Sequence, residues 1–196
     1  MLMDLTLTLP ADFDLLSFSD DRELMKKLLD DGHIGTHFDV VDKAFPIESF
    51  RTNGKIFDIS HIRGREVEIA DLAGQSIDEG DTIIFYTGYM KQFGYSREYA
   101  DYSAELSDET VEYLLSRKIR IIAVDAAGGQ KPKKHKPFDQ YCADHNVFVV
   151  ENLDNLEPLL ERSPEPFLIY TAPLNRQDMT GLPCRVFAEI PDTIAG

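Results

Sequence analysis

The chain of 196 residues carries 20 Lys and Arg residues against 35 Asp and Glu residues, which gives a net charge of −15. This acidic balance argues against a nucleic-acid-binding protein, which needs a basic footprint for phosphates, and against binding to an anionic membrane surface. With 43% hydrophobic and 28% charged residues, the composition is that of a globular chain. A chain of this length can bury roughly 70% of the surface that it exposes when unfolded.

Three features of the sequence bear on the cellular compartment. Cys142 and Cys184 are too few for a disulfide framework. Met1-Leu2-Met3 is followed at once by Asp4, so no apolar stretch of signal length begins the chain. We find no run of about 18 apolar residues that could span a membrane. We therefore expect a cytoplasmic protein with both thiols reduced.

The predicted elements begin with a helix at 20–30, where Leu24, Met25, Leu28 and Leu29 are spaced for one face. The pair Leu28-Leu29 could equally begin a strand. Apolar runs rich in β-branched residues then predict strands at 55–61 and 82–86.

A helix is predicted after Ser107, which can cap it ahead of Asp108 and Glu109 in its first turn. The strand at 119–125 is apolar on nearly both faces, as is typical of a strand buried between layers. Short helices at 138–145 and 153–160 alternate with strands at 147–151, 167–172 and 185–190. This order predicts one mixed α/β domain over residues 1–196.

The segment from Gly32 to Asp39 carries the chemistry that stands out most. His33, His37 and Asp39 are spaced H-x-x-x-H-x-D, and imidazole with carboxylate is a ligand set for Zn, Mn, Fe or Ni. Gly35 and Thr36 disfavour a helix here, and in an extended chain His37 and Asp39 project to the same side. A pair of structural histidines in a loop is the alternative. We favour the metal, because polar groups on a segment that continues into apolar residues need partners.

A second group of candidate ligands lies downstream. Glu151 ends an apolar strand, where α/β folds present site residues, and Asp139 stands twelve residues earlier at the start of a predicted helix. Glu151 could instead serve only as an N-terminal carboxylate for the helix that follows.

The chain resembles the cyclase or kynurenine-formamidase-like family of metal-dependent hydrolases, whose signature reads H-x-G-T-H-x-D-x-P-x-H. The match covers His33, Gly35, Thr36, His37 and Asp39. Collinear matches cover most of the chain: Asp4-Leu5-Thr6, Thr87-Gly88, Val124-Asp125, Glu151-Asn152-Leu153, Pro173-Leu174 and Gly181-Leu182-Pro183-Cys184-Arg185.

This resemblance implies a swivelling α/β/β-type fold, a homodimer or homotetramer, and hydrolysis of amides or lactones with a divalent metal. It implies that His33, His37 and Asp39 bind one ion, Zn or Mn. In members with two ions, Asp39 bridges, Glu151 holds the second ion, and the second-site His falls on Asp139.

Two departures from the signature concern catalysis. Its last His, which the family uses for proton transfer, is Lys43 here, and its Pro is Val41. Lys43 is therefore our candidate catalytic residue, as a desolvated base or an oxyanion stabiliser. We also predict that its ammonium replaces the second cation, paired with Asp139 or Glu151. Alternatively, Lys43 points to solvent beside Asp42.

Two features bear on the substrate. Residues 131–136 hold four lysines, which form either a solvated loop or a collar that attracts an anionic substrate. Asp125 and the tyrosines Tyr86, Tyr89, Tyr95, Tyr99 and Tyr102 are candidates for the pocket lining. Alternatively, the tyrosines are packing residues whose hydroxyl groups meet water.

We expect a metal-dependent hydrolase that acts on a small formamide-like amide, cyclic amide or lactone through a metal-activated water. The alternative is a catalytically reduced, metal-containing module of the same fold that binds a ligand or partner. A purely structural domain without metal is the third hypothesis.

Overall fold

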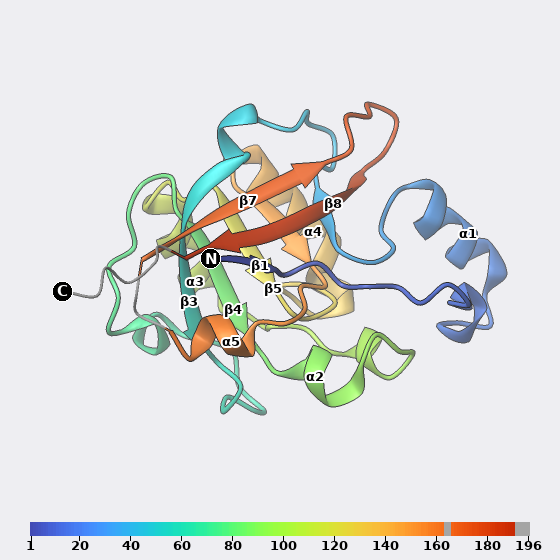
Figure 1. The fold of residues 1–196 in the computed structure, drawn as a ribbon, viewed down its shortest axis with the longest axis horizontal. Coiled ribbons are helices and arrows are strands. Elements are labelled where there is room, and N and C mark those ends of the chain that lie inside the picture. Colours follow the sequence, from blue (N-terminus) through green and yellow to red (C-terminus); the bar gives the residue numbers. More distant parts are fainter. Residues whose placement is uncertain (163–165, 191–196) are drawn as a thin grey trace.

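One closed β-sheet organises the chain in the computed structural model, which describes residues 1–162 and 166–190 (Figure 1). The sheet order is β1-β8-β2-β6-β5-β4-β3-β7, and β7 pairs again with β8. The strands are β1 (Leu2–Asp4), β2 (His37–Asp39), β3 (Arg51–Asp58), β4 (Thr82–Tyr86), β5 (Ile121–Val124), β6 (Phe148–Glu151), β7 (Phe167–Pro173) and β8 (Gly181–Glu189).

Closure depends on β8, which is long enough to serve two neighbours on one edge. Its first residues pair with β2 (Leu182 opposite Phe38), and its last residues pair with β1 (Ala188 opposite Met3). Its other edge pairs with β7 along six residue pairs. The parallel strands β3, β4, β5 and β6 complete the barrel-like sheet, to which β1 adds a short strand outside the ring.

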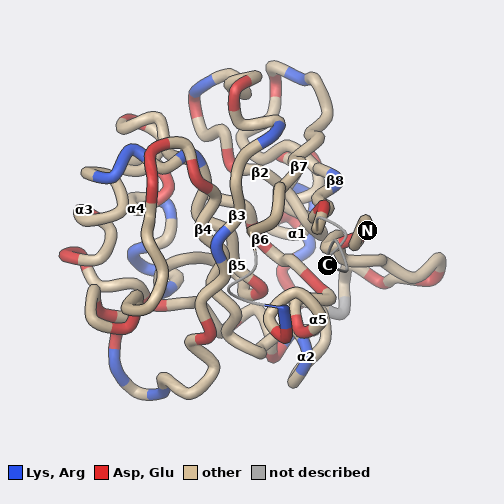
Figure 2. Tube along the Cα trace, turned by 60° about the vertical axis from the view of Figure 1, so that its left-hand side comes forward, with Lys and Arg blue, Asp and Glu red and all other residues tan. Residues whose placement is uncertain are grey.

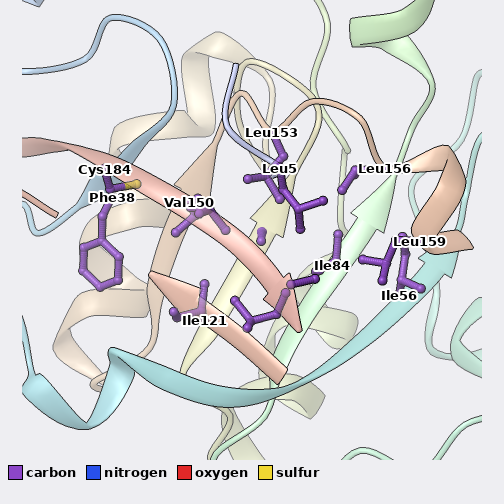
Figure 3. Packing of buried hydrophobic residues seen from close by; sticks show 14 of the residues in the cluster. Leu5, Phe38, Ile56, Ile84, Ile121, Val150, Leu153, Leu156, Leu159 and Cys184 are labelled. Atoms are coloured by element: carbon purple, nitrogen blue, oxygen red, sulfur yellow. The ribbon is translucent and has the colours of Figure 1, made fainter. Parts of the chain in front are cut away.

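Alternating side chains of the strands build two separate cores. The inner core receives residues from all seven strands of the ring, among them Phe38, Val150 and Ile84, and Leu153 and Leu159 join them (Figure 3). The outer core receives the intervening residues of β3 to β6, which pack against two helices. Strands buried on both faces in this way give the apolar runs seen in the sequence.

The helices are α1 (Arg22–Asp30), α2 (Tyr89–Phe93), α3 (Asp108–Ser116), α4 (Pro132–Asp144) and α5 (Glu157–Leu160). In the described part of the chain, 3₁₀ turns lie at Leu15–Ser17, Ile47–Ser49, Ile69–Leu72 and Tyr99–Asp101. Ser107 caps α3 by accepting a hydrogen bond from the Thr110 amide, as its sequence predicts. Pro132 occupies the first turn of α4, where a missing N–H costs nothing.

Every strand and helix predicted from the sequence has a counterpart, and the differences lie at the boundaries. The helix expected at 138–145 begins six residues earlier, at Pro132, so the lysine-rich segment expected as a loop is helical. The helix expected at 20–30 is α1, which begins at Arg22, and Leu28 and Leu29 belong to it rather than to the start of a strand. The part of the predicted domain at 163–165 and 191–196 lies outside the described residues.

Charge is spread along the chain. Asp and Glu occur in most parts of the trace, with Lys and Arg interspersed (Figure 2). Among the described residues, no helix combines the length and apolar character needed to cross a bilayer.

Gly54 of β3 leaves room for an aromatic ring from the neighbouring strand. It lies directly opposite Phe167 of β7, and a Cβ on Gly54 would stand 2.0 Å from that ring. We expect Gly54→Ala to lower the free energy of unfolding by about 1–3 kcal/mol through overpacking. Urea denaturation measures this loss. In a Phe167→Leu background the loss should shrink, and an equal loss in both backgrounds would contradict the steric explanation.

Candidate metal centre

Strand β2 presents its polar residues to one face of the sheet and its apolar residue to the other. Phe38 points into the inner core, so His37 and Asp39 point to the outer face. The antiparallel register sets His37 opposite Glu151 of β6. Directly opposed residues in such a pair have Cβ atoms about 4.5–5.5 Å apart, so the two side chains share one patch of the outer face.

The first cluster consists of His33, His37 and Asp39. His33 Nδ1 lies 3.1 Å from both His37 Nε2 and Asp39 Oδ1, and His37 Nε2 lies 3.4 Å from Asp39 Oδ1. Each of these residues therefore aims one ligand atom at a common point. The spacing argument from the sequence predicted this convergence.

The remaining ring nitrogens of the first cluster have partners that fix which atom faces the centre. His37 Nδ1 lies 2.9 Å from the Gly35 carbonyl oxygen, which can only accept, so Nδ1 carries the hydrogen and Nε2 faces the cluster. His33 Nε2 lies 2.8 Å from Thr180 Oγ1 and leaves Nδ1 toward the cluster. Such partners orient metal-ligating imidazoles.

The second cluster joins helix α4 to the strands. His135 Nε2 lies 2.6 Å from Glu151 Oε1 and 3.3 Å from Asp139 Oδ2, with the two α4 residues one helical turn apart. Together with Asp39, these residues offer four ligand atoms within 4.8 Å of one another. Glu151 also reaches the first cluster, because its Oε2 lies 3.6 Å from His37 Nε2.

Burial distinguishes the floor of this centre from its rim. The side chains of His37, Asp39 and Glu151 are 2–5% exposed, whereas those of His33 and His135 are 26% and 27% exposed. A ligand from solvent would therefore first meet the two rim histidines.

Two buried carboxylate oxygens of the centre have no hydrogen-bond partner: Asp39 Oδ2 and Asp139 Oδ1. An unsatisfied buried oxygen of this kind is costly unless something compensates it. The donor set of imidazoles and carboxylates suits a divalent metal ion. The residues of both clusters therefore fit such an ion.

The pKa values of the metal-free centre also show that its buried carboxylates favour positive charge nearby. Burial lowers the pKa of His37, but Asp39 and Glu151 outweigh it and raise the pKa to about 9. Glu151 raises the pKa of His135 to about 10 against the effect of burial. Burial, with Asp39 nearby, raises the pKa of Asp139. Without a metal ion, the cluster therefore retains protons at neutral pH.

Glycines allow the segment that carries His33 and His37 to lie against the start of strand β8. A Cβ on Gly32 would stand 2.0 Å from the Gly181 carbonyl oxygen, and a Cβ on Gly181 would stand 2.9 Å from the His33 ring. Gly128 likewise leaves room for the His135 ring, 2.9 Å from where its Cβ would be.

The prediction that Lys43 replaces a second cation is wrong. Its ammonium lies 3.0 Å from Asp42 and 2.9 Å from Asp144, and its side chain is 36% exposed. The chain turns away from the site at Val41, whose φ is 56°, so Lys43 meets surface carboxylates instead of Asp139 or Glu151. The alternative that placed it beside Asp42 describes what the structure contains.

Sequence reasoning missed His135, which stands beside Asp139 and Glu151. The signal was present as the i, i+4 spacing of His135 and Asp139. It was hidden because the lysines around His135 suggested a loop, and only a helix brings these two side chains together.

The other expected pocket residues have different partners. The Tyr95 hydroxyl accepts a hydrogen bond from the Gly35 amide, and the Tyr99 hydroxyl bonds Asn152, so both contact the ligand-bearing segments. Asp125 accepts hydrogen bonds from Thr87 and Gly88, and burial raises its pKa to about 6. Of the four lysines, Lys131 pairs with Glu105, and Lys134 pairs with Glu66 and Asp108.

Solved structures with the same fold have low sequence identity to this chain. One is described as a potential metal-dependent hydrolase with cyclase activity (21% identity, TM-score 0.73, 98% of both chains covered). A second is isatin hydrolase A from Labrenzia aggregata (20%, TM-score 0.72, 98% of this chain and 94% of that one). A third is a predicted metal-dependent hydrolase from Bacillus stearothermophilus (21%, TM-score 0.61, 95% and 86%).

Family membership rests on the sequence itself. No curated protein matches the chain. The family model described as "Putative cyclase" matches residues 3–129, more than half of the sequence, including the whole H-x-x-x-H-x-D segment. The chain therefore belongs to the cyclase family.

Proposed function

We propose that the protein is a metal-dependent hydrolase of a small amide, cyclic amide or lactone. The observation that carries the proposal is the pair of imidazole–carboxylate clusters that share Asp39 on the outer face of the sheet. Membership of the cyclase family and the fold shared with isatin hydrolases support it.

The first ion would be held by His33, His37 and Asp39, and a second by Asp39, His135, Asp139 and Glu151. A divalent cation, Zn²⁺ or Mn²⁺, supplies Lewis acidity to a carbonyl group and lowers the pKa of a water ligand to about 7. The protein's own contribution is to hold the buried residues fixed and to leave the rim between His33 and His135 open to a substrate.

The surroundings of the rim support a substrate with a flat apolar part and an acidic group. The Tyr95 ring, which is anchored to the ligand segment at Gly35, lies 4.6 Å from the Phe18 ring and 5.8 Å from the Phe13 ring. Lys133 and Lys136 stand two residues before and one residue after His135 in the sequence and are exposed, so they add positive charge that can attract an anion.

One observation favours the second candidate function, a metal-containing binding module with reduced catalysis. The position that resembles the family's proton-transfer histidine is Lys43, which pairs with surface carboxylates away from both clusters. The activity measurement below distinguishes the two functions.

Activity is tested on an aryl formamide, isatin and a small lactone, with and without Zn²⁺ or Mn²⁺. We expect metal-dependent turnover of at least one class. Glu151→Gln should lower kcat/KM by about 10²-fold or more, because a buried carboxylate of the second cluster that also reaches His37 loses its charge. Glu161→Gln, on the exposed side of the same chain region, is the matched control. A metal-loaded protein that turns over none of these classes would favour the binding module.

His135→Ala tests the part of helix α4 in the centre. We expect it to remove one ion per chain or to weaken binding of that ion by more than the ~10–100-fold that the loss of a partner behind a ligand costs, while His33, His37 and Asp39 retain theirs. Elemental analysis and metal titration measure the loss. His145→Ala is the matched control, because His145 ends the same helix and bonds the Tyr141 carbonyl. Equal metal content in all three proteins would exclude His135 as a ligand.

The stability of the metal-free chain should fall as pH rises from about 6.5 to 8. The raised pKa of His37 (about 9, against 6.5 ordinarily) means that the folded state binds more protons than the unfolded state in this window. Its contribution to stability is complete below pH 6.5 and is lost as pH rises toward 9. Melting temperatures measure this trend, and Zn²⁺ or Mn²⁺ should reverse it. Stability that rises with pH in the metal-free chain would contradict the assigned charges.

A further inference from the structure

The carbonyl oxygen of Gly35 lies behind the first cluster and accepts two hydrogen bonds. One comes from His37 Nδ1 and the other from Asn152 Nδ2, each at 2.9 Å. Asn152 Oδ1 in turn accepts a hydrogen bond from the Tyr99 hydroxyl at 3.0 Å. All three side chains are at least 97% buried, so water does not compete for these bonds.

The donor and the acceptor of each hydrogen bond in this network are determined. The Gly35 carbonyl can only accept, so Asn152 must present its amide nitrogen to it and its amide oxygen to Tyr99. The Tyr99 hydroxyl must therefore donate. His37 must likewise carry its hydrogen on Nδ1, which leaves Nε2 facing His33 and Asp39.

The backbone of Asn152 ties together the two segments that carry ligands. It follows Glu151 directly, and its carbonyl accepts a 2.6 Å hydrogen bond from Thr36 Oγ1, next to His37. Its φ of 58° lies in the left-handed region, which Asn tolerates better than most residues. One residue thus fixes the Gly35–Thr36 turn relative to the end of β6.

We propose that Asn152, held by Tyr99, is a positioning residue. It holds the Gly35 carbonyl oxygen in place, and this oxygen fixes the orientation of the His37 ring and keeps its hydrogen on Nδ1, away from the metal. The inference rests on the proposed metal site and names part of its support. Partners of this kind change metal affinity by about 10–100-fold when they are removed.

Asn152→Gly tests the proposal, because glycine keeps the left-handed backbone and removes only the side chain. Asn155→Gly is the matched control. Asn155 lies in the same loop with φ 57°, and its side chain bonds the Asp4 carbonyl, away from both clusters. Tyr99→Phe removes only the hydroxyl and serves if Asn152→Gly does not fold.

Two measurements are needed. Titration with Zn²⁺ or Mn²⁺ should show that Asn152→Gly raises the dissociation constant by about 10–100-fold and Tyr99→Phe by a smaller factor, while Asn155→Gly matches the parent. In the metal-free chains, ¹⁵N-histidine NMR should show the Nδ1–H proton of His37 exchanging slowly with solvent in the parent and in Asn155→Gly. Its exchange should be faster in the other two variants.

The proposal is overturned if Asn152→Gly and Tyr99→Phe keep both the parent affinity and slow exchange at His37, or if Asn155→Gly changes both as much as Asn152→Gly does. The NMR measurement needs no metal ion. If the parent bound no metal but the variants still released His37, the proposed function would fail while the positioning of His37 by Asn152 would stand.

Discussion

The register between β2 and β6 is the constraint on which both the fold and the site depend. Because side chains alternate along a strand, the pairing of Phe38 with Val150 in the inner core sets His37 against Glu151 on the outer face. A slip by one residue would bury the ligands in the barrel and expose Phe38. The inner core thus specifies the geometry of the centre without contacting it.

The centre brings together charges that a protein interior does not accept without compensation. Asp39, Asp139 and Glu151 are all buried, and the imidazoles of His33, His37 and His135 lie among them. Protons can neutralise this group in the metal-free chain, as the raised pKa values of His37 and His135 indicate. A metal ion competes for the same nitrogen and oxygen atoms, so folding, protonation and metal binding are linked at one place.

Local sequence patterns predicted the first cluster and the position of Glu151, but they did not predict closure of the barrel or the positions of His135 and Lys43. The spacing of His33, His37 and Asp39 and the place of Glu151 at a strand end are short-range signals. Closure of the barrel depends on β8 pairing with residues far away in sequence, which periodicity does not report. His135 and Lys43 were misjudged for a related reason. The direction of each side chain is set by a local backbone feature, the start of α4 and the turn at Val41, that composition obscured.

The first turn of α4 opposes the helix dipole, and this has a consequence for the site. Lysines crowd the positive end of the helix around His135, and Pro137 removes a backbone hydrogen bond within it. Ion pairs of Lys131 and Lys134 with surface carboxylates offset the repulsion. Salt weakens exposed ion pairs of this kind. Salt screens the repulsion from the helix dipole as well, so the two effects oppose each other, and the placement of His135 depends on its contacts with Glu151 and Asp139 more than on the surrounding electrolyte.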